Sequence, residues 1–135
     1  MKNIKYMKYV IGIDGGGTKS IISIADLQGN IIATEYGGPT NIIAQEELQL
    51  YGSLSSLIER AIEKADLKIE NCKAICIGTA GAGRKEEQNI VRECIQSVGI
   101  KENVVITNDA EIVIATVTSG REGIAVIAGT GSIAY

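Results

Sequence analysis

The sequence predicts an α/β protein built on a mixed five-stranded sheet with helices on both faces. Two observations predict this class. Three β-branched segments come first, with only tight links between them: Tyr9–Asp14, Ser20–Asp26 and Asn30–Tyr36. After them the chain alternates between helical and strand patterns. Adjacent strands followed by alternating units fit such a sheet.

The first helix is expected from about Gln45 to Asp66, after a loop that contains the chain's only proline, Pro39. Its apolar residues recur at helical spacing, at Leu48, Tyr51, Leu54, Leu57, Ile58, Ala61, Ile62 and Ala65. This pattern predicts an amphipathic helix with one buried face.

The later elements are expected in the order strand, helix, strand, helix, strand: Lys73–Gly78, Arg84–Val98, Val104–Thr107, Asn108–Ser119 and Gly123–Ala128. Gly99 should end the second helix, because glycine readily adopts the left-handed conformation that closes a helix. Its expected inward residues are Ile90, Val91, Cys94, Ile95 and Val98. The last strand has no partner within this count.

Composition limits the function classes. The 135-residue chain is 45% hydrophobic and 21% charged, as in a soluble single domain, and its net charge of −3 gives no reason to expect nucleic acid. The apolar run before Asp14 is too short for a signal-peptide core or a membrane span. Three cysteines without framework spacing suit a reducing cytoplasm. Because the chain has no histidine, a general base here must be a carboxylate, lysine, tyrosine or cysteine.

A glycine-rich turn joins the first two expected strands. After Asp14 the chain continues through Gly15, Gly16, Gly17 and Thr18. Consecutive glycines let backbone N–H groups converge on an anion such as phosphate, and the Asp14 carboxylate could hold Mg²⁺ directly or through water. The spacing fits neither a P-loop nor the dinucleotide fingerprint, since Ser20 occupies the last glycine position of the latter. The alternative is an ordinary glycine hairpin.

A second turn of this kind lies near the other end of the sequence, where the apolar run Ile124–Ala128 is followed by Gly129, Thr130, Gly131 and Ser132. Two such turns indicate two similar halves that each present a loop to one ligand. Together with the intervening segments Pro39–Asn41, Gly78–Arg84 and Thr107–Ala110, they resemble the BadF/BadG/BcrA/BcrD ATPase family of the actin/hexokinase/Hsp70 superfamily, in the family's order.

This resemblance implies the ribonuclease-H-like domain of an actin-like ATPase, with strand order 3-2-1-4-5. Residues 1–120 would form this N-terminal domain. Residues 121–135 would be the first strand and phosphate turn of a second domain that this chain does not contain. The implied protein is an ATP- and Mg²⁺-dependent kinase of N-acetylglucosamine or a related hexosamine, of which the isolated chain would be an inactive half.

The resemblance also implies roles for individual residues. The turns Gly15–Thr18 and Gly129–Ser132 would bind the ATP phosphates, and Asp14 would hold Mg²⁺. Asp109 matches the sugar kinases' catalytic aspartate, where it would contact the substrate and act as base; the alternative is a helix N-cap, a role that Asn108 could take instead.

Two segments would contact the sugar. Asn41 matches a sugar-contacting asparagine in the family, although by itself it could be only a turn residue. The loop Thr79, Ala80 and Gly81 follows a strand that ends on the same side as Asp14, and its small residues would let a sugar ring approach the backbone. An ordinary glycine-rich loop before a helix is the alternative.

Two other functions stay open. Some family members are ATPases that activate acyl-CoA dehydratases or reductases through an iron–sulfur cluster bridging two subunits. Their cluster cysteine precedes the second turn at the position that Val126 holds here, while Cys76 and Cys94 lie in apolar patterns typical of core residues. An inactive nucleotide-binding fragment is the third possibility. For the kinase we expect an amino-sugar substrate, no nucleic acid or membrane partner, a full-length homodimer and a cytoplasmic location.

Overall fold

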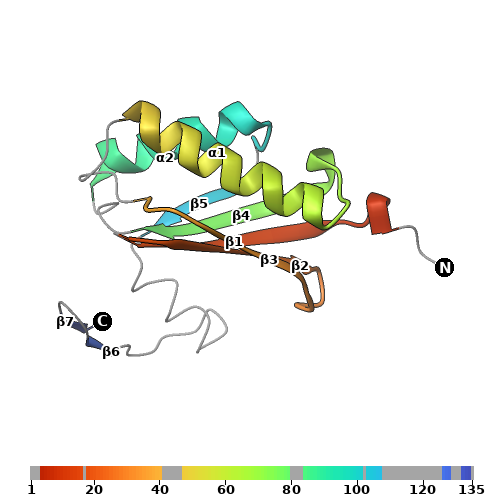
Figure 1. The fold of residues 1–135 in the computed structure, drawn as a ribbon, viewed down its shortest axis with the longest axis horizontal. Coiled ribbons are helices and arrows are strands. Elements are labelled where there is room, and N and C mark those ends of the chain that lie inside the picture. The colour runs from red at the N-terminus through yellow and green to blue at the C-terminus, as the bar shows by residue number, and fades with distance from the viewer. Residues whose placement is uncertain are drawn as a thin grey trace.

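The computed structural model describes residues 4–16, 18–40, 47–79, 84–101, 103–107, 126–128 and 132–134. Five strands form the main sheet (Figure 1): β1 (Tyr9–Gly15), β2 (Ser20–Asp26), β3 (Ile31–Gly37), β4 (Cys72–Thr79) and β5 (Val104–Thr107). The described helices are α1 (Glu47–Lys64), α2 (Lys85–Val98) and the short 3₁₀ turns η1 (Ile4–Tyr6) and η2 (Ile69–Asn71). A separate two-stranded sheet pairs β6 (Val126–Ala128) with β7 (Ser132–Ala134).

The strand order of the main sheet is β3-β2-β1-β4-β5, which confirms the expected order. β2 runs antiparallel to both β1 and β3, whereas β4 is parallel to β1 and β5 is parallel to β4. Tight turns can join only antiparallel strands, and parallel neighbours need a longer crossover. The short links of the first three strands and the helical links of the last two therefore produce the mixed sheet.

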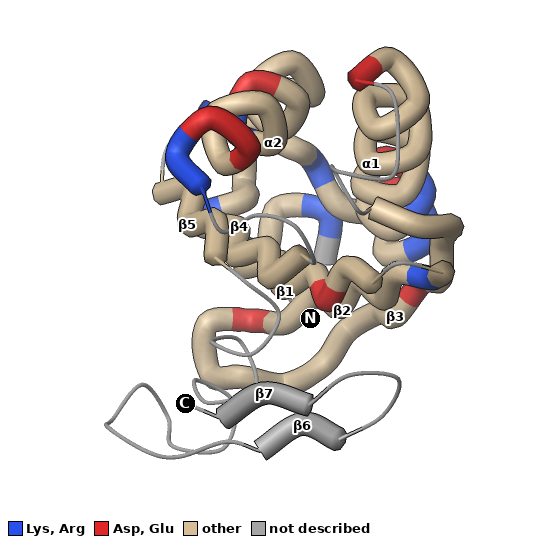
Figure 2. The backbone as a smooth tube through the Cα atoms, turned by 90° about the vertical axis from the view of Figure 1, so that its left-hand side faces the viewer, with Lys and Arg blue, Asp and Glu red and all other residues tan. Residues whose placement is uncertain are grey.

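Both α1 and α2 lie on one face of the sheet, side by side (Figures 1 and 2). The connections β3–α1–β4 and β4–α2–β5 both move toward β5, and right-handed crossovers that move in one direction place their helices on the same face. We call this side the helix face and the other the opposite face. Helices on both faces were expected; the helix predicted over Asn108–Ser119 lies outside the described residues.

The core lies between the helix face and the two helices. Alternate strand residues point into it, and these are fully or almost fully buried: Ile11, Ile13, Ile22, Ile24, Ile75 and Ile77. The helix α1 contributes Leu50, Leu54, Leu57, Ile58, Ala61 and Ile62. Each leucine or isoleucine among them stabilises the fold by about 1.5–3 kcal/mol when it leaves water. Burial alternates with period two along β1 and most of β2, as expected for strands with one face on the core.

One residue of the expected apolar face of α1 is misassigned. Leu48 is 85% exposed, and Leu50 is buried in the first turn instead. Residues two apart on a helix lie about 200° apart around the axis, so only one of the two can join the stripe that Leu54 continues. In α2 the expected inward residues Val91, Cys94 and Ile95 are buried.

The helix ends follow ordinary capping chemistry. The Arg84 backbone N–H donates to Glu87 Oε2 at 2.8 Å at the start of α2. Gly99 ends that helix with φ of 115°, the left-handed conformation predicted for it. α1 ends at Lys64 rather than at Asp66, which itself has φ of 53°.

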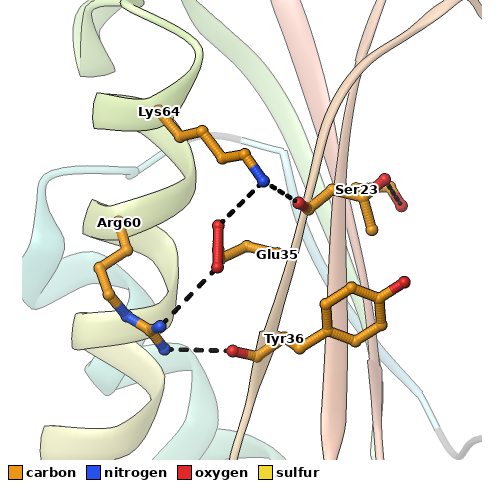
Figure 3. Close-up of polar contacts among 6 residues, drawn as sticks. Ser23, Glu35, Tyr36, Arg60 and Lys64 are labelled. Carbon is orange, nitrogen blue, oxygen red and sulfur yellow. Dashed lines mark hydrogen bonds and ion pairs between the residues drawn. The ribbon is translucent and has the colours of Figure 1, made fainter.

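Basic side chains of α1 cover the edge strand β3 (Figure 3). Lys64 Nζ donates to the Thr34 carbonyl at 3.0 Å, and Arg60 donates to the Tyr36 carbonyl at 3.3 Å. Glu35 lies between the two cations, 3.4 Å from Lys64 and 3.9 Å from Arg60. Edge carbonyls left open could pair with another chain, so this charged cover protects the strand.

The opposite face carries a shallow apolar hollow of about 320 Å³. Val10, Gly12, Ala74, Cys76 and Val105 are among its lining residues. Cys76 is therefore half-buried on the opposite face rather than packed among the helices, whereas Cys94 lies in the core as predicted.

We predict that the fold loses stability above about pH 9 because of Tyr9 and Cys72. The Tyr9 hydroxyl is buried and donates to the Lys68 carbonyl at 3.0 Å; burial, Cys72 and Glu70 raise the Tyr9 pKa well above 10.0. Burial also raises the pKa of the Cys72 thiol from 9.0 to about 11. Both groups ionise at lower pH in the unfolded chain, so their stabilisation is complete below about pH 9 and falls as pH rises.

Urea midpoints measured from about pH 8 to about pH 11 check this, since linkage acts on unfolding free energy. Tyr9→Phe should cost about 1 kcal/mol near pH 8 through its lost hydrogen bond and should flatten the decline above pH 10. Tyr36→Phe is the control, because Tyr36 is 63% exposed. Equal alkaline slopes in Tyr9→Phe and the parent chain would contradict the assignment.

Candidate active site

Three strands that lead into predicted functional segments end at one edge of the main sheet. These are β1, β4 and β5, which are parallel; Figure 2 views this end. In the register, Asp14 pairs with Gly78, and Gly78 pairs with Thr107. Ligands of open α/β sheets gather beyond such carboxyl ends.

Asp14, Gly78 and Thr107 form a row across this edge on the opposite face. Their neighbours Ile13, Ile77 and Ile106 point to the helix face, so the alternation of each strand turns the row the other way. Asp14 and Thr107 are two strand spacings apart, roughly 10 Å. Gly78, in the strand between them, has no side chain and is itself buried.

Asp14 has the properties of a Mg²⁺ ligand. Its side chain is exposed at the end of β1, and its carboxylate supplies the hard oxygen donors that this cation prefers. Among the described residues no group of three or more His, Cys, Asp or Glu side chains could hold a metal. A single protein carboxylate suits Mg²⁺, which keeps several waters and takes further ligands from substrate phosphates.

Thr107 was not singled out from the sequence. It is 8% exposed at the end of β5, and within the described part of the chain its hydroxyl has no hydrogen-bond partner. A buried hydroxyl without a partner costs about 1–3 kcal/mol, so the Thr107 hydroxyl is a candidate to bind a ligand at the row. Asn108 and the expected base Asp109 follow it directly but lie outside the described residues.

The first glycine turn is closed by its own backbone. The Gly16 N–H donates to the Lys19 carbonyl at 2.8 Å, and Gly15 pairs with Ser20 as β2 begins. The Gly16 amide is therefore used inside the turn, which narrows the predicted phosphate donors. Thr18 and Lys19 are exposed; Gly17 lies outside the described residues.

The loop that leads to Asn41 is attached to this turn. The Thr40 N–H donates to the Gly16 carbonyl at 3.1 Å, and Ser20 Oγ donates to the Gly38 carbonyl at 2.8 Å. Asn41 itself is outside the described residues. The structure thus brings the segment Gly38–Thr40, which ends one residue before it, to the same edge as the predicted phosphate turn.

Thr79 does not present its side chain to the row. It is fully buried on the helix face, where its hydroxyl donates to the Thr40 carbonyl at 2.8 Å and lies 3.2 Å from Thr40 Oγ1. Ala80 and Gly81, the other predicted sugar contacts of this loop, are outside the described residues. Thr40 belongs to a segment that the sequence marked, but its buried hydroxyl could not be read from local pattern.

The second predicted phosphate turn lies in the sequence between β6 and β7. These strands are antiparallel, with Ala128 paired to Ser132, so the last predicted strand has a partner that the sequence did not lead us to expect. Gly129, Thr130 and Gly131 lie between them, outside the described residues.

The thiols of Cys72 and Cys94 are poorly suited to be ligands of an exposed iron–sulfur cluster. Burial raises the pKa values of Cys72 and Cys94 to about 11, which keeps both thiols protonated at neutral pH. Cluster ligands are thiolates.

The strand order and the mixed strand directions are those predicted for the ribonuclease-H-like domain of actin-like ATPases. A solved structure from Chromobacterium violaceum, described as a candidate N-acetylglucosamine kinase, shares this fold. It is 26% identical, with a TM-score of 0.74 over 96% of this chain and 45% of its own. Residues 11–135 match the BadF/BadG/BcrA/BcrD ATPase family, and the chain belongs to that family.

Two curated relatives are amino-sugar kinases. The N-acetylmuramic acid/N-acetylglucosamine kinase of Clostridium acetobutylicum is 44% identical over 129 residues, covering 96% of this chain and 42% of that kinase. The glucosamine kinase of Vibrio cholerae is 31% identical over 126 residues, covering 93% of this chain and 42% of its own. The chain thus spans about two fifths of the length of these relatives.

We predict that Gly15→Ala disturbs the site whereas Gly12→Ala does not. A Cβ at Gly15 would overlap Thr40 Oγ1 and would lie 2.9 Å from Thr79 Oγ1, while a Cβ at Gly12 meets nothing within 4 Å. Overpacking of this kind costs about 1–3 kcal/mol. Gly12→Ala should be neutral or stabilising by about 0.5–1 kcal/mol, because glycine weakens a strand.

Urea denaturation of both variants beside the parent chain is the measurement, and the two glycines lie in one strand, which makes the pair a matched comparison. Equal stabilities for Gly15→Ala and Gly12→Ala would show that the threonine hydroxyls leave room at Gly15.

Proposed function

We propose that the protein to which this chain belongs is an ATP-dependent kinase that transfers the γ-phosphate to a hydroxyl of N-acetylglucosamine or a related hexosamine. The observation that carries the proposal is the 44% identity over 129 residues with a kinase of N-acetylmuramic acid and N-acetylglucosamine. In this view residues 1–120 are the first domain, and residues 121–135 begin a second.

Phosphoryl transfer asks the protein for positioning and charge stabilisation more than for covalent chemistry. In our proposal two opposed turns, Gly15–Thr18 and Gly129–Ser132, fix the phosphates of ATP through backbone N–H groups. Because Gly16 donates within its own turn, the first-turn donors fall to Gly17 and Thr18. Thr130 adds a hydroxyl in the second turn.

Asp14 would hold Mg²⁺, directly or through water. The bound ion would neutralise charge on the phosphate oxygens. Asp14's own part is to present its exposed carboxylate at the end of β1, in the row with Gly78.

Asp109 is the proposed base. It follows Thr107 by two residues, and Thr107 ends β5 beside Gly78. An ionised aspartate there would accept the proton of the sugar hydroxyl as the oxygen attacks. Asn41 and the loop Thr79–Gly81 would hold the sugar, the latter through its backbone, because the Thr79 side chain is turned inward.

The substrate class follows from what the relatives' names share, which is a hexosamine with a free or acylated nitrogen. A full-length homodimer in the cytoplasm completes the proposal; three cysteines without framework spacing suit that compartment. No helix within the described ranges is long and apolar enough to cross a membrane.

The test of the proposed function is a coupled assay of the full-length protein with ATP, Mg²⁺ and a panel of N-acetylglucosamine, N-acetylmuramic acid, glucosamine and glucose. We expect turnover with at least one amino sugar and a kcat/KM at least about tenfold lower with glucose, since a site built for a polar substituent rejects the analogue that lacks it. Turnover with none of the amino sugars would refute the kinase.

Asp109→Asn in the full-length protein should lower kcat by about a hundredfold to ten-thousandfold while ATP still binds, as expected for loss of a general base. Asp66→Asn is the matched control, because Asp66 is an exposed carboxylate beyond α1. Steady-state rates and calorimetric ATP titrations measure the two effects. Near-normal kcat in Asp109→Asn would remove this residue from the mechanism.

A further inference from the structure

A pair of threonine side chains is buried beneath the first glycine turn. Thr40 is 1% exposed and Thr79 is 0% exposed, and they are 39 positions apart in the sequence. Buried hydroxyls are costly unless they are hydrogen-bonded to each other or to the backbone, and these two are bonded to both.

The hydrogen bonds between them have one consistent direction. Thr79 Oγ1 donates its proton to the Thr40 carbonyl at 2.8 Å. Each hydroxyl has one proton, so at the 3.2 Å contact between the two hydroxyl oxygens Thr40 must be the donor. The result is a closed ring of two hydrogen bonds that joins the end of β4 to the loop after β3.

This ring lies directly against the predicted phosphate turn. Gly15 pairs with Thr79 in the sheet, and a Cβ on Gly15 would overlap Thr40 Oγ1 and come within 2.9 Å of Thr79 Oγ1. The Thr40 N–H also donates to the Gly16 carbonyl at 3.1 Å. The two threonines therefore hold both the position of Gly15 and the peptide that follows Gly16.

The pair lies behind the site rather than in it. Thr79 shares the helix face with Ile75 and Ile77, whereas the Asp14 side chain belongs to the row on the opposite face. A ligand at the row would therefore not contact either threonine side chain.

We propose that Thr40 and Thr79 are positioning residues. They act as a clamp that holds the first phosphate turn where its backbone N–H groups can bind the ATP phosphates. The clamp rests on the proposed kinase function. It also ties that turn to the segment that ends at Thr40, one residue before Asn41.

The kinetic test uses Thr40→Val, Thr79→Val and their double variant in the full-length protein. Thr79→Val removes both hydrogen bonds of the ring, whereas Thr40→Val leaves the bond from a Thr79 hydroxyl to the backbone carbonyl of residue 40. Thr79→Val should therefore raise the KM for ATP about tenfold and change the KM for the sugar less than about threefold, and Thr40→Val should raise the KM for ATP less. The double variant should be no worse than Thr79→Val alone, since that single change already removes the ring.

The serine variants and a control distinguish positioning from packing. Thr40→Ser and Thr79→Ser keep the hydroxyls and should restore the KM for ATP to within about threefold, whereas a packing role would need the methyl group instead. Thr34→Val is the control, because Thr34 lies in β3 and its hydroxyl makes only a 3.5 Å contact with Ser23. Unchanged KM for ATP in both folded valine variants would overturn the clamp.

Hydrogen exchange of the Thr40 amide in the 135-residue chain provides a readout that does not need activity. This amide donates to Gly16, so Thr79→Val should accelerate its exchange about tenfold relative to the parent chain and Thr34→Val. If the full-length parent protein has no kinase activity but exchange accelerates in Thr79→Val, the proposed function fails and the structural clamp stands. Exchange that stays at the parent rate overturns the clamp, and Thr40→Ser, which keeps this amide and its hydroxyl, should match the parent.

Discussion

The parallel pairing of β1 with β4 is the contact on which the rest of the structure depends. Its register sets Asp14 beside Gly78 and Gly15 beside Thr79, so one pair of strands supplies both the proposed ligand side and its support. A shift of one residue along β4 would turn every side chain of that strand to the other face. Thr79 would then leave Gly15, and Gly78 would no longer lie beside Asp14.

At this edge of the sheet, the helix face provides packing and the opposite face presents the proposed ligand-binding residues. On the helix face, the isoleucines of β1 and β4 exclude water, and the threonine ring continues that layer with hydroxyls in place of methyl groups. On the opposite face, Asp14 is exposed, and between it and Thr107 lies Gly78, which has no side chain. A rigid support behind an exposed edge is what phosphate positioning requires, because a displaced amide loses its bond to the oxygen it should meet.

Local pattern was enough for the strands and most of the buried stripe of α1, because such spacing is a property of short segments. The strand order came from the family resemblance. Local pattern could not choose between Leu48 and Leu50, since the first turn of a helix has few neighbours to fix its phase. It also could not pair Thr40 with Thr79, which meet only through the fold. The one-sided placement of α1 and α2 follows from crossover handedness once the strand order is known.

Because charged side chains cover the edge strand β3, the tendency of this fold to self-associate should depend on ionic strength. Lys64 and Arg60 occupy the Thr34 and Tyr36 carbonyls from the side, so this border of the sheet is closed by mobile charged arms rather than by another strand. Such arms exchange with water and weaken as counterions screen Glu35 from its two cations. Acetylation of Lys64 would remove its charge and its attraction to Glu35, and would so weaken the cover over the Thr34 carbonyl. A modification of this helix could in this way change the protein's solubility without altering Asp14 or the glycine turn.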